Sequence, residues 1–184
     1  MRRSTMGMLI AAATLSTRLA AQAVSLGLAA TVGSNWQVEA ADIGYLRPVH
    51  AGPLRSVMLS ARAGSFIDEG AIINGSRGFV GGLALGLRTG LARLADVGNE
   101  TNPATIGADL TLEMGGYAGT NSPLPQGSSW VAVSLLPGVR FQGEGVRYGL
   151  VVGPTVFFGS VKPQLHAFLG VRFEFPLAHH SGRP

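Results

Sequence analysis

The chain has 184 residues, a length that fits a single domain. It contains no cysteine, which excludes disulfide bonds, thiolate metal sites and a thiol nucleophile. Charged residues make up only 13% of the sequence, whereas a water-exposed surface carries about 25–35%. We therefore do not expect a surface that is covered by water throughout.

Residues 1–23 have the features of a secretory signal peptide, so we expect an exported protein. Arg2 and Arg3 precede an apolar run, and Ala21-Gln22-Ala23 is a small-x-small cleavage site. Without Arg2, Arg3 and Arg18, 11 of the 14 Lys and Arg residues remain against 10 Asp and Glu, a formal charge of about +1. This balance predicts no nucleic-acid partner. No run of 18 apolar residues follows residue 23, so no transmembrane helix is predicted.

The rest of the chain alternates between large apolar side chains and small or polar ones with a period of two, which is typical of β-strands. Such runs predict eight strands, at residues 24–33, 36–47, 54–66, 79–93, 104–115, 130–142, 146–158 and 165–177. A tilted strand crosses a bilayer in about 9–11 residues, and each run reaches that length. Connections of hairpin length predict an all-β, antiparallel, up-and-down arrangement.

The second strand is irregular, and the connections differ in length. Trp36 and Val38 fall on one parity but Ile43 and Tyr45 fall on the other, which predicts a β-bulge near residues 40–42. Longer loops are predicted at residues 67–78 and 116–129, with a tight turn at Gly143-Glu144 on the opposite side of the membrane. Residues 178–184 are expected to form a disordered tail.

Alternation alone does not say which face of the sheet meets water. A soluble lipocalin-like barrel would place leucine and valine inside, whereas a membrane barrel would place them outside. The scarcity of charge and the Gly- and Ala-rich polar face favour the membrane barrel. Aromatic residues near strand ends are interpreted as interfacial girdles, namely Trp36, Tyr45, Phe66, Phe79, Trp130, Phe141, Tyr148, Phe158, Phe173 and Phe175.

The signal peptide, the eight strands and the aromatic-ended last strand, Phe173-Glu174-Phe175, together resemble the small outer-membrane barrels of the OmpA, OmpX and opacity-protein type. The resemblance implies an eight-stranded antiparallel up-and-down transmembrane β-barrel over residues 24–177, located in the bacterial outer membrane. It further implies that the barrel is surrounded by outer-membrane lipid and that the barrel-assembly machinery recognises the last strand. We expect a monomer.

The inward parity carries a group of charged residues that we interpret as a structural network in the lumen: Arg62, Arg88, Asp109, Glu113, Arg140, Arg147, Arg172 and Glu174. Glu39 would join them if the second strand has the inward register. Folding the hairpins predicts three neighbours: Arg88 near Asp109, Arg140 opposite Arg147, and Glu174 next to Arg147. A gated polar channel and a salt-bridged plug both fit this pattern, and the narrow lumen of eight strands favours the plug.

Catalysis is not predicted. A barrel lipid deacylase needs Ser and His adjacent on a strand, with an acid to orient the His. His166 has no neighbouring Ser and is interpreted as a packed lumen residue, and nothing would orient His179 and His180 beside Ser181. No phosphate loop, cofactor site or metal-ligand spacing is present. The sequence therefore predicts a non-enzymatic barrel with an envelope-stabilising or surface-interaction role. A small porin-like channel and a soluble periplasmic lipocalin-like barrel that binds a lipophile remain alternatives.

Overall fold

The computed structural model describes residues 22–33, 36–68, 76–120, 129–143, 145, 147–159 and 162–177. The predicted tail lies outside these residues, and so does the predicted signal peptide except for its last two residues. Within the described ranges there is no helix long and apolar enough to cross a membrane.

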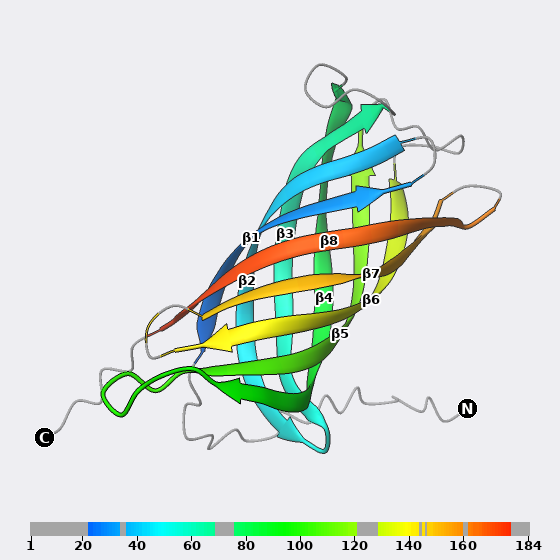
Figure 1. Cartoon of the computed structure of the whole chain (residues 1–184). Helices are drawn as coiled ribbons and strands as arrows, with labels where there is room; N and C mark the ends of the chain where they lie inside the picture. The colour runs from blue at the N-terminus through cyan, green and yellow to red at the C-terminus, as the bar shows by residue number, and fades with distance from the viewer. Residues whose placement is uncertain are drawn as a thin grey trace, which may run out of the picture.

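Eight strands form one closed barrel in which each strand pairs with its neighbours in the chain. The strands are β1 (Ala23–Val32), β2 (Trp36–Ala51), β3 (Leu54–Asp68), β4 (Ser76–Asp96), β5 (Thr105–Gly119), β6 (Ser129–Gln142), β7 (Arg147–Phe158) and β8 (Gln164–Pro176). The seam joins β1 to β8, antiparallel, from Ala23 opposite Pro176 to Val32 opposite Ala167 (Figure 1). The predicted all-β, antiparallel, up-and-down barrel of eight strands is therefore confirmed.

The two ends of the barrel differ, and we name them by their connections. The start of β1 and the end of β8 lie at the lower end in Figure 1, together with the β2–β3, β4–β5 and β6–β7 turns, and we call this the termini end. The opposite end is the loop end. The structure extends β3 to Asp68 and β5 to Gly119, so both strands run into the segments predicted as long loops. Residues 69–75 and 121–128 lie outside the described ranges.

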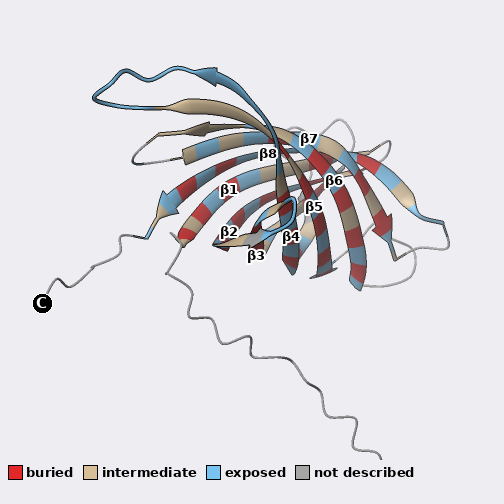
Figure 2. Ribbon diagram, turned by 90° about the horizontal axis from the view of Figure 1, so that it is seen from below, coloured by how far each residue is buried: buried red, intermediate tan, exposed pale blue. Residues whose placement is uncertain are grey.

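Side chains alternate between the lumen and the outer face along the strands, as the period of two requires. In β8, His166, Phe168 and Arg172 are buried, whereas Leu165 and Leu169, on the opposite parity, are exposed. Figure 2 shows this alternation as bands of buried and exposed colour along the strands. The same alternation runs through the middle of β5, where Thr111 and Glu113 are buried and their apolar neighbours face outward. The apolar side of each strand therefore forms the outer wall of the barrel.

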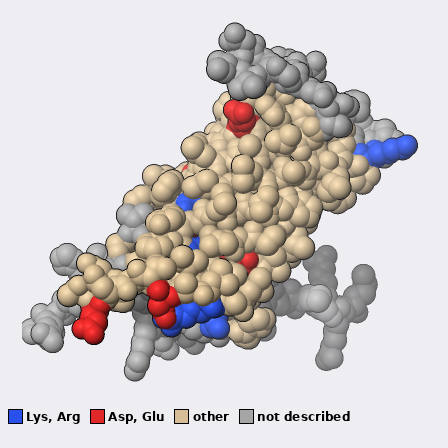
Figure 3. All heavy atoms as spheres, viewed as in Figure 1, with Lys and Arg blue, Asp and Glu red and all other residues tan. Residues whose placement is uncertain are grey.

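The outer wall exposes more large hydrophobic side chains than the surface of a water-soluble protein does. Leu165, Leu28 and Leu83 are 69%, 67% and 60% exposed. Monomeric soluble proteins rarely expose continuous apolar surfaces of this kind. Figure 3 shows a wall with few charges over its middle. The barrel is therefore built to sit in lipid, and the alternative of a soluble barrel with a leucine-lined ligand cavity is wrong, because these leucines face outward.

The predicted bulge near residues 40–42 is wrong. The β1–β2 and β2–β3 ladders run without a break through this region, with Ala40 opposite Ala29 and Asp42 opposite Gly27. Trp36 and Asp42 are consequently both buried, and Glu39 points outward rather than joining the lumen. The irregular apolar pattern reflects a real mixture on the inward face, with Trp36 and Val38 toward one end and the acid Asp42 further along.

The register shift in this hairpin lies instead between Pro48 and Ala51, beside the β2–β3 turn. Gly52 in that turn has a φ of 59°, a left-handed conformation that residues with a Cβ rarely adopt. The turn therefore depends on glycine, and it leaves the long β2–β3 ladder intact on the barrel side of the shift.

The outward direction of the leucines can be tested with Leu112, which is exposed in the middle of β5. We expect Leu112→Arg to lower the free energy of unfolding in lipid by about 2–4 kcal/mol, because a charge near the bilayer midplane loses its hydration. Urea unfolding in phosphatidylcholine vesicles, followed by tryptophan fluorescence, measures this. Val97→Arg is the matched control, since Val97 is exposed beyond the end of β4, and it should change little. Equal stability of both variants would contradict a lipid-facing wall.

Candidate functional site

Four charged side chains meet across the lumen and form a closed ring of ion pairs, which we call the central ring. Its members are Asp42 from β2, Arg62 from β3, Glu113 from β5 and Arg172 from β8. Arg62 Nη2 lies 3.3 Å from Asp42 Oδ2 and 3.0 Å from Glu113 Oε1. Arg172 closes the ring, with Nη2 2.6 Å from Glu113 Oε2 and Nε 3.7 Å from Asp42 Oδ2. The ring pairs two guanidinium groups with two carboxylates and is formally neutral.

A second ring of the same composition lies nearer the termini end, and we call it the mouth ring. It consists of Arg88 from β4, Asp109 from β5, Arg140 from β6 and Glu174 from β8. Arg88 Nη2 lies 2.6 Å from Glu174 Oε1, and Arg88 Nε lies 3.8 Å from Asp109 Oδ2. Arg140 Nε lies 3.6 Å from Asp109 Oδ2, and Arg140 Nη1 lies 3.9 Å from Glu174 Oε2. The longer distances make this ring looser than the central ring.

The stability of the folded barrel depends on both rings, because their charged side chains are buried. The side chains of the central ring are 2–9% exposed, and those of the mouth ring are similarly buried except for Arg140 at 21%. A buried ion pair adds little net stability over an apolar substitute, but removing one partner leaves a charge that neither water nor protein neutralises. Each ring therefore connects four strands, and in both rings β8 is joined to strands far from it in the chain.

The lumen toward the loop end is closed by packed aromatic rings rather than by charges. We call Trp36, Phe66, Trp130, Phe157 and His166 the aromatic cap. Their ring centroids are separated by 5.7 Å for Trp36–Phe66, 5.2 Å for Trp36–Phe157, 4.1 Å for Trp36–His166 and 5.2 Å for Phe66–Trp130. Such edge and tilted contacts favour aromatic packing. Trp36 Nε1 donates a hydrogen bond of 2.9 Å to Gln164 Oε1, so the polar edge of the indole is satisfied.

Arg62 and Tyr117 connect the aromatic cap to the central ring. Arg62 Nη1 donates a hydrogen bond of 2.8 Å to the Tyr117 hydroxyl, and the guanidinium lies 5.4 Å from the centroid of Phe168. Tyr117 stacks in turn on Trp130, with centroids 6.1 Å apart. The Tyr117 ring lies so close to Gly82, its partner across the β4–β5 ladder, that a Cβ there would collide with it. The glycines of the inward face thus make room for large side chains in a narrow lumen.

Seven of the eight charged residues predicted for the lumen belong to the two rings, and Arg147 is the exception. Arg88 approaches Asp109 as predicted. Glu174 is opposite Arg147 in the β7–β8 ladder, as predicted, but its ion pairs are with Arg88 and Arg140. The predicted pairing of Arg140 with Arg147 is wrong, because the ladder sets Arg140 opposite Gly149 and Arg147 opposite Gln142. The connection from β6 to β7 spans residues 143–146 and is longer than a two-residue turn.

Two parts of the lumen escaped the sequence prediction. Asp42 is a full member of the central ring, and only continuation of the Trp36 parity through the strand would have placed it there. Trp36, Phe66 and Trp130, predicted as interfacial girdle residues, are buried inside the barrel. Aromatic residues at strand ends occupy either face of the sheet. Their position at a strand end therefore predicts an interfacial location only when the alternation along the strand also places them on the outer face.

The lumen offers no catalytic arrangement among the residues that the structure describes. His166 is buried against Trp36 and Phe157, with Thr155 as its partner in the β7–β8 ladder. The Thr155 hydroxyl donates to Ser134 Oγ at 2.7 Å rather than to the imidazole. No group of three His, Asp or Glu side chains in the described ranges is placed to hold a metal ion. The predicted tail residues His179 and His180 lie outside those ranges.

These features define the class of the protein: an eight-stranded transmembrane β-barrel with an apolar exterior and a lumen filled by side chains. The predicted resemblance to the small outer-membrane barrels is thus confirmed for the fold. No protein-family model matches the sequence, and no curated protein matches it. Among solved structures, the crystal structure of Neisserial surface protein A is similar to this chain. The match covers 85% of this chain and 96% of that protein's chain, with a TM-score of 0.47 and 10% sequence identity.

A double-mutant cycle on the central ring tests its coupling. We expect Glu113→Ala and Arg172→Ala each to lower the free energy of unfolding by about 3–5 kcal/mol, because each leaves a buried charge unpaired. The double variant should lose less than the sum of the two. Urea unfolding of the refolded protein in vesicles provides the three values. The exposed pair Arg93 and Asp96 is the control, and its cycle should give about 0–1 kcal/mol. Additive losses at Glu113 and Arg172 would refute the coupling.

The aromatic cap predicts that the same substitution costs different amounts of stability on the inner and outer faces of the barrel wall. Phe66 is fully buried in the cap, whereas Phe158 is 45% exposed on the outer wall. Phe66→Ala should cost about 3–5 kcal/mol of stability, because it opens a cavity among packed aromatic rings. Phe158→Ala should cost clearly less, since lipid fills the space that the ring leaves. Urea unfolding in vesicles measures both losses of stability. A larger loss for Phe158→Ala than for Phe66→Ala would contradict packing of the aromatic residues inside the barrel.

Proposed function

We propose that this chain is an exported, non-enzymatic outer-membrane barrel that stabilises the cell envelope and does not conduct ions. The apolar outer wall supports a location in lipid, and the predicted signal peptide supports export. A closed barrel leaves no unpaired sheet edge in the hydrocarbon, where an unsatisfied backbone group would cost several kcal/mol. These properties suit a protein whose task is to be a stable membrane element.

The occlusion of the lumen at three levels carries the proposal. Ions that enter at the termini end meet the mouth ring, then the central ring, and then the aromatic cap. A cavity of ≈ 30 Å³ lies between the cap and Arg62, lined by Thr31, Trp130 and Phe168 among others. That volume holds about two water molecules, so it is a small pocket and not a continuous water column.

A small porin-like channel is the second candidate, and one observation favours it. The termini end opens into a hollow of ≈ 260 Å³ that reaches Arg88 and Glu174. Conduction would require both rings and the cap to rearrange. The tight contacts of the central ring, down to 2.6 Å, weigh against such rearrangement.

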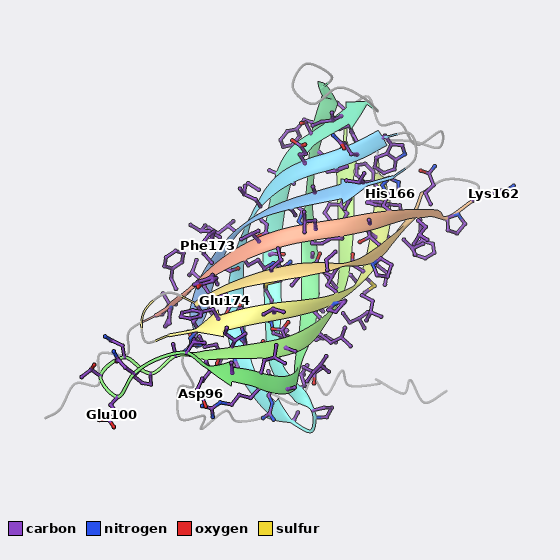
Figure 4. All side chains as sticks on the ribbon, viewed as in Figure 1. Asp96, Glu100, Lys162, His166, Phe173 and Glu174 are labelled. Atoms are coloured by element: carbon purple, nitrogen blue, oxygen red, sulfur yellow. The ribbon has the colours of Figure 1, made fainter. Side chains whose placement is uncertain are left out.

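The surroundings of the barrel follow from the same proposal. Outer-membrane lipid would contact the leucine-rich wall. Phe173 and Phe175 are exposed on the outer side of β8, and Glu174 between them is buried in the lumen. Figure 4 labels Phe173 and Glu174. The two phenylalanines are the residues that the barrel-assembly machinery would recognise. Each of the eight described strands exposes large apolar side chains, which suits a monomer surrounded by lipid. A surface-interaction role would belong to the loop end, where Lys162 and the start of β8 lie (Figure 4).

Planar-bilayer recording tests the closed lumen. The wild-type barrel, added in increasing amounts to a bilayer in concentrated salt solution, should insert without discrete current steps. Replacing one cation and one anion of the central ring together, as Arg62→Ser with Glu113→Ser, keeps the lumen neutral but removes two large side chains. This variant, combined with Trp36→Ala in the cap and with Arg88→Ser and Glu174→Ser in the mouth ring, should give small steps, because all three levels of occlusion are then opened and water fills the lumen.

The control for this experiment is Arg93→Ser with Asp96→Ser, which removes an exposed pair outside the lumen and should leave the bilayer silent. A shift in gel mobility between boiled and unboiled samples would establish that each variant is folded before recording. Current steps from the wild-type protein would overturn the proposal and favour the channel.

A further inference from the structure

The hollow at the termini end has a strongly basic lining, which the neutral rings do not explain. It is bounded by Arg55, Arg88, Arg140 and Arg147, with Gln142 and Glu174 beside them. A second hollow adjoins it and shares Arg55, Arg140 and Gln142. We call the first hollow the vestibule. Charged side chains gather toward this end of the molecule (Figure 3), whereas the opposite end of the lumen is aromatic.

The vestibule holds two positive charges more than its carboxylates neutralise. Within the mouth ring, Arg88 and Arg140 balance Asp109 and Glu174. Arg55 and Arg147 add two further guanidinium groups, and neither forms an ion pair with a carboxylate of the described residues. Arg55 occupies the extra position left by the register shift between Leu54 and Ser56, which places it at the rim.

One buried donor at the floor of the vestibule has no partner. Arg88 is 6% exposed, and its Nη2 and Nε atoms face Glu174 and Asp109. Its Nη1 atom is buried and makes no hydrogen bond with any described residue. An unpaired buried donor of a charged group costs free energy that an acceptor from outside the protein would recover. The floor thus presents one buried N–H donor without an acceptor, and Arg147 and Arg55 add two guanidinium groups without a carboxylate partner among the described residues.

We propose that the vestibule binds a small oxyanion, a phosphate or the phosphate end of a larger molecule, between Arg88, Arg147 and Arg55. Guanidinium groups match the oxygen geometry of phosphate and bind it through paired, charge-assisted hydrogen bonds. Two uncompensated charges in a hollow walled by protein attract an anion more strongly than they would in water. The volume of ≈ 260 Å³ is at the lower limit of small-molecule pockets, so it suits a phosphate group rather than a whole nucleotide.

The route of entry restricts the source of the anion. The barrel wall separates the vestibule from the lipid, and the rings and the cap separate it from the loop end. The anion therefore enters from the aqueous side at the termini end. A free phosphate and the headgroup of a phospholipid at the rim share the required chemistry, and the two are distinguished by experiment.

Isothermal titration of the full mature chain in phosphatidylcholine nanodiscs, at low ionic strength, tests the site with inorganic phosphate. We expect saturable binding to the wild type. The double variant Arg55→Gln with Arg147→Gln leaves both rings intact, so it should fold, as heat-dependent gel mobility would show. Its affinity should fall about tenfold or more, because each lost charge-assisted hydrogen bond contributes about that factor.

Arg47→Gln is the control, since Arg47 lies on the outward face of β2 near the same end of the barrel. This substitution removes one positive charge without changing the vestibule. Its affinity for phosphate should match that of the wild type. Titration with short-chain dihexanoyl phosphatidylglycerol, below its micelle concentration, identifies the source: tighter binding of inorganic phosphate indicates a free anion, and tighter binding of the lipid indicates a headgroup. Absence of saturable binding of both titrants, or equal affinity in the wild type and the double variant, would overturn the proposal.

Discussion

Charge in a space that water cannot fill is the constraint on which this barrel depends. Eight strands enclose a lumen just wide enough for side chains, so every carboxylate and guanidinium in it needs a partner from another strand. The protein meets this requirement twice with the same device, a ring of two arginines and two acids. The rings also restrict the register, because sliding any member strand by one residue would turn its charge into the lipid.

The lumen is divided along its length into a charged part and an aromatic part, and Arg62 belongs to both. Its guanidinium pairs with Asp42 and Glu113 on one side and lies against Tyr117 and Phe168 on the other. The charged part opens toward the termini end, while the aromatic part closes the loop end. The molecule is therefore asymmetric inside, although its outer wall is apolar along most of its height. Any exchange of solutes with the lumen is directed to the termini end.

The alternation of residue types predicted the number of strands, their order and the membrane-facing side, because a barrel wall separates two environments at every second residue. It predicted the inward charged residues for the same reason. Pairing across the lumen could not be predicted from hairpins alone: Glu113 and Arg172 meet across the barrel from β5 and β8. The Arg140–Arg147 error came from the length of one turn, and Asp42 was missed because a bulge was inferred from apolar residues alone. Trp36 and Trp130 show that an aromatic residue at a strand end does not by itself indicate an interface.

The place of β8 in both rings has a consequence for how the chain reaches this state. Arg172 and Glu174 are among the last described residues, yet their partners lie in β2, β4, β5 and β6. Until β8 meets β1, the inner face of the unfinished sheet carries acids and arginines whose partners have not arrived. Contacts of such large sequence separation form late and slowly. Closure of the seam therefore completes the neutralisation of the interior, because Arg172 and Glu174 supply the last partners of both rings. An incomplete chain would keep unpaired charges on its inner face and would be retained on the polar side of the bilayer.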